Sequence, residues 1–424
     1  MIFTKMKILD QVKMAFGAKI GSLDMDLTID VKTDITTRPI VADLDPKRKE
    51  VIIFGTKDGR LIAVRGSGIE WIFSAKETKS DVEELFRDES RGNSINSQPI
   101  VADINKDGNL EILFGSDNGK LYALDSTGNY MWDFKTKDSI RTTPIYTDIT
   151  SDNASYVIFG GNDGFLYCLD PLGALIWKFK ASSGIESSPA YLVKGKERQI
   201  VFGSNDGTLY SVNSDGQLNW KHKLKAKVSA QPAIGDVFGD NDPHIAVGTT
   251  DGAMNLFSSD GELLWTYKTG GSIPNAAVLA DLNNDKKLEI IFGSCDDNVY
   301  VLSAEGSKIW SFETSFWVAS TPIVADIDND GKLEVIICSY DQSVYILDGQ
   351  GQYILNYVPG LSSITQQSGH YTDLLSIPPG RFVGKKIWEY RTDGKIIGSD
   401  LDKAKMSIVV TTNNGKISIL KHKP

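Results

Sequence analysis

The sequence predicts an all-β fold, an eight-bladed β-propeller of four-stranded antiparallel blades, from three observations. First, residues 98–136 hold four short apolar runs, and Asp, Asn or Gly residues follow the runs, as in strands joined by tight turns. Second, one unit is divided between the two ends of the chain. Third, the unit recurs every 43 to 45 residues, the size of a propeller blade, with a tryptophan in each copy: Trp132, Trp177, Trp220, Trp265 and Trp310.

The N-terminal region supplies the first part of the ring. Residues 1–26 are an extension, of which residues 1–20 can form an amphipathic helix. This helix could pack on the propeller, dock to a partner or lie on a membrane surface, and the sequence does not decide among these three roles. Residues 27–33 then match the last strand of a blade, although the three strands that should precede it are absent.

The missing three strands are predicted at the other end, after Ile396. The chain ends where a fourth strand is due, so residues 27–33 can complete the C-terminal blade by pairing with residues 416–420. Such closure leaves no open sheet edge. We therefore predict a single propeller over residues 27–424. Its eight blades begin near Pro39, Pro99, Pro144, Pro189, Pro232, Ala277, Pro322 and Ile396.

Two intervals between blades are long and predict insertions, near residues 74–97 and 358–386. The first is highly charged, and Asp81–Phe86 could form a helical turn. The second precedes Trp388–Thr392, which resembles an outer strand displaced along the chain. Long loops on rigid scaffolds often carry binding sites, so Val358–Lys386 is a candidate contact surface.

Six copies carry Asp-Gly or Asn-Gly between their second and third strands. These dipeptides reach the positive φ angles that tight hairpins require, so we interpret their side chains as turn residues and not as catalytic groups. The pairs are Asp58-Gly59, Asn118-Gly119, Asp163-Gly164, Asp206-Gly207, Asp251-Gly252 and Asn414-Gly415.

Two families share parts of this repeat. The segment Ala123–Trp132, with Gly128 four residues before Trp132, resembles the tryptophan-docking repeat of PQQ-like quinoprotein propellers. The segment VADINKDGNLEILFGS resembles the FG-GAP repeat of integrin α-subunit propellers. Both resemblances imply a propeller, and they imply little about activity because such propellers serve as enzymes, scaffolds and sensors. An adjacent cysteine pair, expected for a quinone site, is absent from the sequence, so PQQ is not the expected cofactor.

The pattern D-x-[DN]-x-D-G-x-x-E predicts structural Ca²⁺ sites. Alternating oxygen ligands, a bend-permitting Gly and a closing carboxylate suit a hard cation. The alternative is a set of Asp-rich turns held by their own hydrogen bonds. Two copies are intact and a third has Lys286 in place of Gly; the blade-five copy is irregular, with Asp236, Asp240 and Asp242. The predicted ligands are Asp103, Asn105, Asp107, the carbonyl of Asn109, and Glu111; Asp326, Asp328, Asp330, the carbonyl of Lys332, and Glu334; and Asp281, Asn283, Asp285 and Glu289.

The net charge and the cysteine content limit the expected partners and the cellular location of the protein. The formal charge of −10 disfavours nucleic acid and anionic membranes as partners. Three widely spaced cysteines indicate neither a disulfide framework nor a zinc ribbon, and no signal peptide or transmembrane stretch is evident, so a cytoplasmic location is expected.

The functional prediction is a non-catalytic binding or scaffold module for a protein or a small ligand, including a ligand in the central channel, with Ca²⁺ as a brace. The alternatives are a PQQ-dependent oxidoreductase and a carbohydrate-binding or carbohydrate-processing propeller. The four histidines, His222, His244, His370 and His422, are dispersed and are interpreted as surface or hydrogen-bonded residues, so no catalytic residue is predicted.

Overall fold

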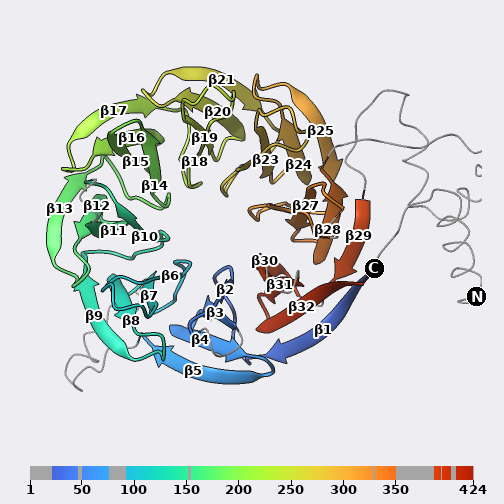
Figure 1. Ribbon diagram of the computed structural model, residues 1–424, viewed down its shortest axis with the longest axis horizontal. Helices are drawn as coiled ribbons and strands as arrows, with labels where there is room; N and C mark the ends of the chain where they lie inside the picture. The colour runs from blue at the N-terminus through green and yellow to red at the C-terminus, as the bar shows by residue number, and fades with distance from the viewer. Residues whose placement is uncertain are drawn as a thin grey trace, which may run out of the picture.

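The computed structural model describes residues 22–45, 50–75, 92–150, 154–327, 330–349, 386–392, 394–402 and 407–423. The described residues form eight four-stranded antiparallel sheets, arranged as blades in a closed ring (Figure 1). This confirms the predicted fold class. The predicted N-terminal helix, the helical turn at Asp81–Phe86 and almost all of the insertion Val358–Lys386 lie outside the described residues.

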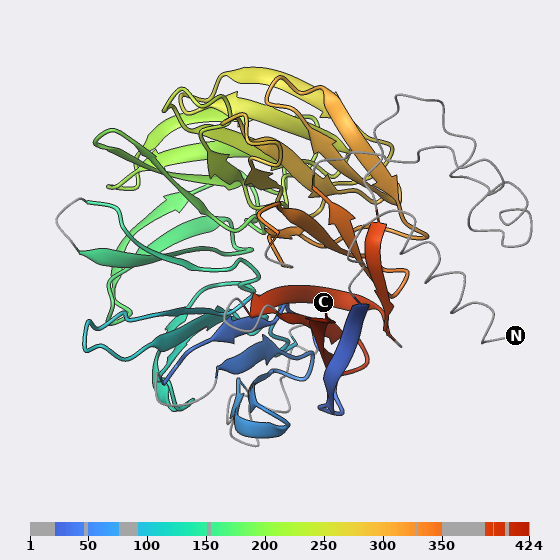
Figure 2. The same cartoon turned by 45° about the vertical axis from the view of Figure 1, so that its right-hand side comes forward.

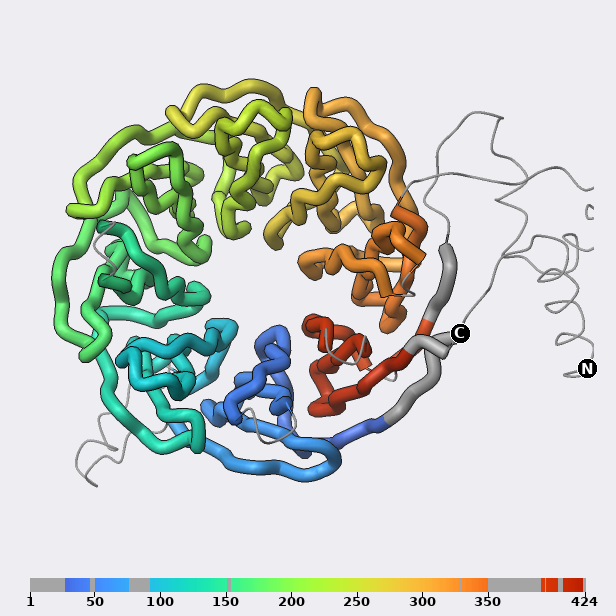
Figure 3. Tube along the Cα trace, viewed as in Figure 1, coloured from blue at the N-terminus to red at the C-terminus, as the bar shows by residue number. Residues whose placement is uncertain are grey.

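In each blade the strands follow one another from the axis outward and are called A, B, C and D (Figures 1 and 3). Blades one to three are β2 Ile40–Ala42, β3 Val51–Gly55, β4 Arg60–Arg65 and β5 Gly68–Ser74; β6 Ile100–Ala102, β7 Glu111–Gly115, β8 Lys120–Leu124 and β9 Tyr130–Lys135; and β10 Ile145–Asp148, β11 Ser155–Gly160, β12 Phe165–Leu169 and β13 Leu175–Lys180. Blades four and five are β14 Ala190–Lys194, β15 Glu197–Gly203, β16 Thr208–Asn213 and β17 Leu218–Lys223; and β18 Ala233–Gly235, β19 His244–Gly248, β20 Ala253–Ser258 and β21 Leu263–Lys268. Blades six to eight are β22 Val278–Ala280, β23 Glu289–Gly293, β24 Asn298–Leu302 and β25 Lys308–Glu313; β26 Ile323–Ala325, β27 Glu334–Cys338, β28 Ser343–Asp348 and β29 Lys386–Arg391; and β30 Ile396–Asp402, β31 Ser407–Thr412, β32 Lys416–Lys423 and β1 Ser22–Asp30.

The ring has two faces, because neighbouring strands of a blade are antiparallel. The A–B and C–D connections lie on one face, which we call the A–B face. The B–C connections and the D–A loops that join successive blades lie on the other, the B–C face. The predicted calcium loops, which follow strand A, therefore share the A–B face.

Apolar side chains pack between adjacent blades. In blade two the rings of Phe114 and Tyr122 stack with their centres 5.3 Å apart. Phe73, from the outer strand of blade one, packs edge-to-face with both rings. The same arrangement joins Phe134 to Phe159 and Tyr167 in the next blade. The outer strands of blades one to six each supply an aromatic ring to the next blade: Phe73, Phe134, Phe179, His222, Tyr267 and Phe312. The core of the ring is therefore a series of interfaces that no single blade could bury alone.

Four of the five repeated tryptophans dock on the following blade through the indole N–H, whereas the Nε1 of Trp310 is buried without a partner among the described residues. The indole Nε1 of Trp132 donates to the carbonyl of Pro171 at 3.1 Å. A Cβ atom added at Gly173, which has φ of 84°, would come within 2.7 Å of the Trp132 ring. The glycine is required both for its positive φ and for the close approach of the indole. Equivalent Nε1 bonds join Trp177 to Ser214, Trp220 to Ser259 and Trp265 to Ala304.

The two ends of the chain close the ring. Strand β1 pairs antiparallel with β32, placing Leu27 opposite Ile419 and Ile29 opposite Ile417, which confirms the predicted closure (Figure 2). The pairing begins at Ser22, five residues before the predicted boundary at residue 27, since β32 continues to Lys423 and offers partners to the earlier residues.

Blade seven keeps its outer strand despite the predicted insertion. Strand β29 pairs with β28, and Trp388 lies opposite Ile346, which confirms that the displaced segment is the D strand of this blade.

Cys168, Cys295 and Cys338 are all free, as expected from their spacing. Within the described residues, no helix has the length and apolar character needed to cross a membrane.

Candidate functional site: the loops of the two faces

The A–B loop of blade two folds around the side chain of Asp103. Its two carboxylate oxygens accept the backbone N–H groups of Asp107 at 3.1 Å and Gly108 at 3.0 Å. The Asn105 amide oxygen also accepts from the Asp107 N–H at 2.9 Å, and Asp107 accepts from the Asn109 N–H at 2.8 Å. The predicted ligands at alternate positions are therefore gathered on the inside of one tight turn.

The same turn recurs in blades six and seven. Asp281 accepts from Asp285 and Lys286, and Asp326 accepts from Asp330 and Gly331, at 2.9 to 3.1 Å. The sixth position has positive φ in each loop, 87° at Gly108, 72° at Lys286 and 85° at Gly331. Lys332 also donates its N–H to Asp330 at 2.8 Å. Asp328 lies outside the described residues.

A buried glutamate closes each of these three turns at the first residue of strand B. Its carboxylate accepts the N–H of the second loop residue, from Ile104 to Glu111 at 2.8 Å, from Leu282 to Glu289 at 2.7 Å and from Ile327 to Glu334 at 2.9 Å. Glu289 also accepts from the Asn283 amide at 2.9 Å. The structure thus joins each closing glutamate to its turn.

Burial changes the acidity of these glutamates. Burial is the largest cause that raises the pKa of Glu289 to about 7, and the charges of Asp285 and Asp281 act in the same direction. The pKa of Glu111 is likewise raised, first by burial and also by the charges of Asp107 and Asp103. A bound cation would oppose both effects, because it favours the ionised carboxylate.

The A–B loop of blade five keeps the turn and changes its side chains. Asp236 accepts the N–H groups of Asp240 at 3.0 Å and Asn241 at 2.8 Å, and φ is positive at Gly239 (73°) and Asn241 (68°). Phe238 stands where Asn105 stands in blade two, and His244 stands where Glu111 stands.

The structure gives His244 an environment that the sequence interpretation did not predict. His244 is only 5% exposed, so it is not a surface residue, and its Nδ1 is buried without a hydrogen-bond partner among the described residues. One ring nitrogen of His244 and one oxygen each of Asp236 and Asp240 lie within 4.8 Å of one another. The eight-residue spacing from Asp236 to His244, equal to that from Asp103 to Glu111, was a signal that could have identified this group.

The B–C face has a repeated backbone frame. In each blade of the described chain, the N–H of a B–C turn residue donates to the carbonyl of the preceding D–A loop, for example Asp117 to Ser94 at 2.9 Å and Asn162 to Ser139 at 2.9 Å. The glycines of the six predicted Asp-Gly and Asn-Gly pairs all have positive φ, between 77° and 86°. This confirms their prediction as turn residues.

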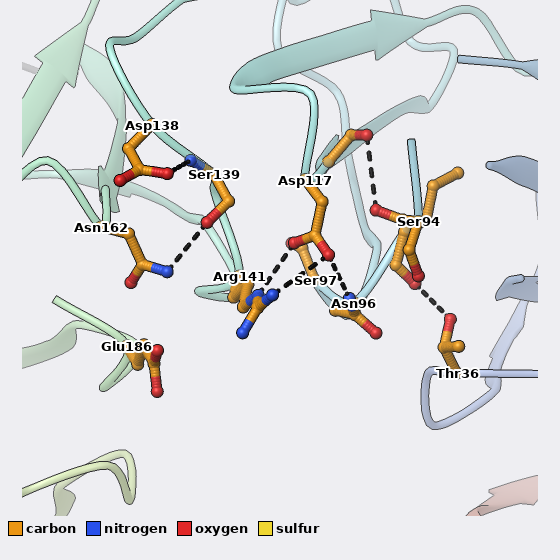
Figure 4. Close-up of polar contacts among 12 residues, drawn as sticks. Thr36, Ser94, Asn96, Ser97, Asp117, Asp138, Ser139, Arg141, Asn162 and Glu186 are labelled. Atoms are coloured by element: carbon orange, nitrogen blue, oxygen red, sulfur yellow. Dashed lines mark hydrogen bonds and ion pairs between the residues drawn. The ribbon is translucent and has the colours of Figure 1, made fainter. Parts of the chain in front are cut away.

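Polar side chains cover part of this face (Figure 4). Arg141 donates from Nε to Asp117 at 2.9 Å, and the Asn96 amide donates to the same carboxylate at 2.8 Å. Asp117 is the largest cause that raises the pKa of Arg141. Farther round the ring, Lys227 forms an ion pair with Glu186. The side chains of neighbouring blades are therefore linked by charge across their loops.

Blade seven departs from this polar pattern, and the sequence interpretation missed it. Its D–A loop carries Phe316 and Trp317, which are 45% and 44% exposed and stack with ring centres 5.2 Å apart and planes 8° from parallel. The corresponding residues in blade three are Asp138 and Ser139. The backbone is unchanged, since the Thr314 hydroxyl donates to the Phe316 carbonyl as Thr136 donates to Asp138. The aromatic pair is thus a substitution on a fixed frame.

These features define a closed β-propeller with an array of acidic turns on one face and a partly aromatic, partly charged loop surface on the other. The model of the lambda-carrageenase β-propeller domain matches residues 51–163, 142–218, 199–309 and 275–357. Together these matches span residues 51–357, and the chain belongs to this β-propeller family. None of the curated proteins matches the sequence.

Solved structures share the fold at low sequence identity. BamB from Moraxella catarrhalis is 17% identical, with 94% of this chain and 97% of that chain covered and a TM-score of 0.62. The C-terminal WD40 domain of Sif2 is 12% identical, with 96% and 100% covered and a TM-score of 0.64. Sqt1 from Saccharomyces cerevisiae is 11% identical, with 95% and 100% covered and a TM-score of 0.67. At these identities the likeness establishes the fold alone.

Proposed function

We propose that this protein is a non-catalytic binding module that holds a protein partner on its B–C face. The observation that carries the proposal is the exposed stack of Phe316 and Trp317 on an otherwise polar loop frame. Large aromatic side chains supply much of the binding energy in protein interfaces, because they bury a large area at low cost in conformational entropy.

The surroundings of the pair suit the same role. The carbonyl of Trp317 accepts the N–H of Tyr340 at 2.9 Å, so the aromatic loop is fixed to the B–C turn of its own blade. The ammonium of Lys395 lies 3.6 Å from the centre of the Tyr340 ring. A rigid aromatic anchor beside a cation offers both apolar contact and charge recognition. Among structures of similar fold, BBS1N has been solved in complex with ARL6DN.

A comparative pull-down from the native host tests this proposal. The variant Phe316→Ser/Trp317→Ser removes the aromatic stack from an exposed loop. The matched control is Leu172→Ser, because Leu172 is 78% exposed but belongs to the C–D turn of blade three on the A–B face. We expect the double variant to lose the proteins that the wild type and the control retain. Retention of the same proteins by the double variant contradicts the proposed surface.

The membership in a carrageenase-type family favours one second candidate, a glycan-binding role for the same aromatic pair. Aromatic faces also accept the apolar faces of sugar rings. Calorimetry with a panel of neutral and anionic oligosaccharides distinguishes the two candidates. Saturable glycan binding that Phe316→Ser/Trp317→Ser abolishes would favour this second role over a protein partner.

A dye-reduction assay tests the quinoprotein alternative. Dye reduction in the presence of PQQ and Ca²⁺ would contradict a non-catalytic module.

We also propose that Ca²⁺ braces the A–B loops of blades two, six and seven. The support is the turn itself, which gathers Asp103, Asn105 and Asp107 and ties Glu111 to them. The carbonyls of Asn109 and Lys332 would each add a ligand, and oxygen ligands in this number and order suit Ca²⁺. The ion would stabilise the A–B face while the B–C face binds the partner.

A further inference from the structure

The A–B loop of blade five contains a three-residue group with mixed nitrogen and oxygen donors. We propose that Asp236, Asp240 and His244 form a binding site for a divalent transition-metal ion of the Zn²⁺ class. This site is separate from the proposed Ca²⁺ loops and does not depend on the protein-binding function.

The geometry of the group suits a small ion. One donor atom from each residue lies within 4.8 Å of the other two. Donor atoms around a tetrahedral zinc ion lie roughly 3.3–3.6 Å apart, given metal–ligand distances of about 2.0–2.2 Å. Small side-chain rotations would therefore close the group around an ion. The carboxylate of Asp240 is exposed, which leaves a path for entry and a position for water as a further ligand.

His244 supplies an independent indication of a ligand. It starts strand β19 and is 95% buried, and its Nδ1 is buried without a hydrogen-bond partner among the described residues. Buried polar atoms in proteins are normally paired, so the unpaired Nδ1 of this buried imidazole requires an explanation. A metal ion held by these three side chains provides one.

The ring of His244 is also held in place. Phe238 packs edge-on against it, with ring centres 4.7 Å apart and planes at 81°. In blade two the same loop position carries Asn105, an oxygen donor. The change to phenylalanine removes one oxygen from the loop and fixes the imidazole that replaces the closing glutamate. Both changes disfavour Ca²⁺, which takes six to eight oxygen ligands, and favour an ion that accepts imidazole.

The other acidic residue of the loop has a different role. Asp242 lies 3.4 Å from the ammonium of Lys194, which also pairs with Asp260 at 2.9 Å. Asp236 is positioned by the N–H groups of Gly239, Asp240 and Asn241, at 2.8 to 3.0 Å. Carboxylate oxygens have more than one lone pair, so Asp236 can accept these bonds and still bind an ion.

Zinc titration of the metal-stripped full-length protein tests the site. Competition against a chromophoric chelator, followed by absorbance, gives the stoichiometry and affinity of the protein for Zn²⁺. Co²⁺ serves as a spectroscopic probe of the same site. The variants are His244→Asn and Asp240→Asn, and the matched control is Glu111→Gln at the equivalent position of blade two. Thermal melting in chelator establishes that each variant is folded; Asp240 is exposed, so its variant remains informative even if His244→Asn is unstable.

We expect one tight Zn²⁺ equivalent in the wild type and in Glu111→Gln. Loss of a direct ligand should weaken binding by at least the 10–100-fold typical of the loss of an outer-shell partner, in both His244→Asn and Asp240→Asn. The wild type loaded with Co²⁺ should show the visible absorption of an imidazole-containing site of low coordination number. This absorption should be absent from both variants. Absence of tight Zn²⁺ binding in the wild type, or unchanged stoichiometry and affinity in both variants, would overturn the proposal.

Discussion

The A–B loops of blades two and five have the same backbone turn and different donor atoms. In both, the first aspartate accepts the N–H groups of the fifth and sixth loop residues, and φ is positive at the fourth and sixth positions. The side chains at positions three and nine differ, Asn105 and Glu111 against Phe238 and His244. The comparison teaches that the repeat specifies the turn; under the two proposed assignments, the side chains at positions three and nine would select the ion.

Exchanging those two side chains should have the largest effect. The double variant Phe238→Asn/His244→Glu gives the blade-five loop the oxygen donors of blade two on its existing turn. We expect Zn²⁺ affinity to fall by more than about 100-fold and a new Ca²⁺ equivalent to appear, because the donor set changes from mixed to all-oxygen. Calorimetry with each ion measures both changes. Unchanged preference for Zn²⁺ would show that the two side chains do not select the ion.

Removal of Ca²⁺ should have the next largest effect. A ligand at 100 times its dissociation constant adds about 2.7 kcal/mol to folding stability. We therefore expect chelator to lower the melting temperature of the wild type by a few degrees in Ca²⁺-containing buffer.

The variant Asp107→Ala/Asp330→Ala is the control for that experiment, since it removes one central ligand from each intact loop. Its melting temperature should fall less in chelator than that of the wild type, because only the blade-six loop keeps all of its proposed Ca²⁺ ligands. Equal responses of the wild type and the variant would count against Ca²⁺ in these loops.

The raised pKa of Glu289 predicts a pH dependence in chelator. Its pKa is about 7 in the fold against 4.5 as the ordinary value, so the folded state binds the proton more tightly than the unfolded state does. The associated stability is fully present below pH 4.5 and is lost as pH rises through 7, amounting to about 3 kcal/mol. Ca²⁺ should abolish the dependence because it binds the ionised carboxylate.

Urea unfolding at about pH 5 and about pH 8, with Glu289→Gln as the reference, measures this effect. Glu289→Gln should gain stability relative to the wild type at the higher pH in chelator, and lose that advantage when Ca²⁺ is added. A constant difference between the two proteins at both pH values would exclude a titrating Glu289.

The smallest effect is expected at Lys286, which occupies a position of positive φ, 72°, where the other two loops have glycine. Lys286→Gly should relieve strain of about 1 kcal/mol, partly offset by greater freedom in the unfolded chain. It should also strengthen Ca²⁺ binding in blade six by removing a nearby cation. Gln342→Gly, at φ of 75° in a B–C turn, provides the same backbone relief and should leave Ca²⁺ affinity unchanged.

The fold was predictable from sequence because its rules are local and repeated. Gly128 and Trp132 mark the unit by their spacing, and residues 27–33 match an outer strand without the rest of its blade. The start of β1 at Ser22 was not predicted, since it depends on how far β32 continues as a partner.

The sites were less predictable because they depend on departures from the repeat. The turn of the Asp103 loop follows from its motif, whereas His244 interrupts that motif and its burial follows from packing against Phe238. Phe316 and Trp317 resemble core residues in sequence. Their exposure follows only from their place on a loop whose backbone carries polar side chains in other blades.

The distinction between the loops of blades two and five can be tested most directly by anomalous diffraction from crystals grown with both Zn²⁺ and Ca²⁺. Data collected above and below the zinc absorption edge should give a zinc peak among Asp236, Asp240 and His244, and none in the Asp103–Glu111 loop. A zinc peak in the Asp103–Glu111 loop, or none beside His244, would contradict the assignment of different ions to one shared turn.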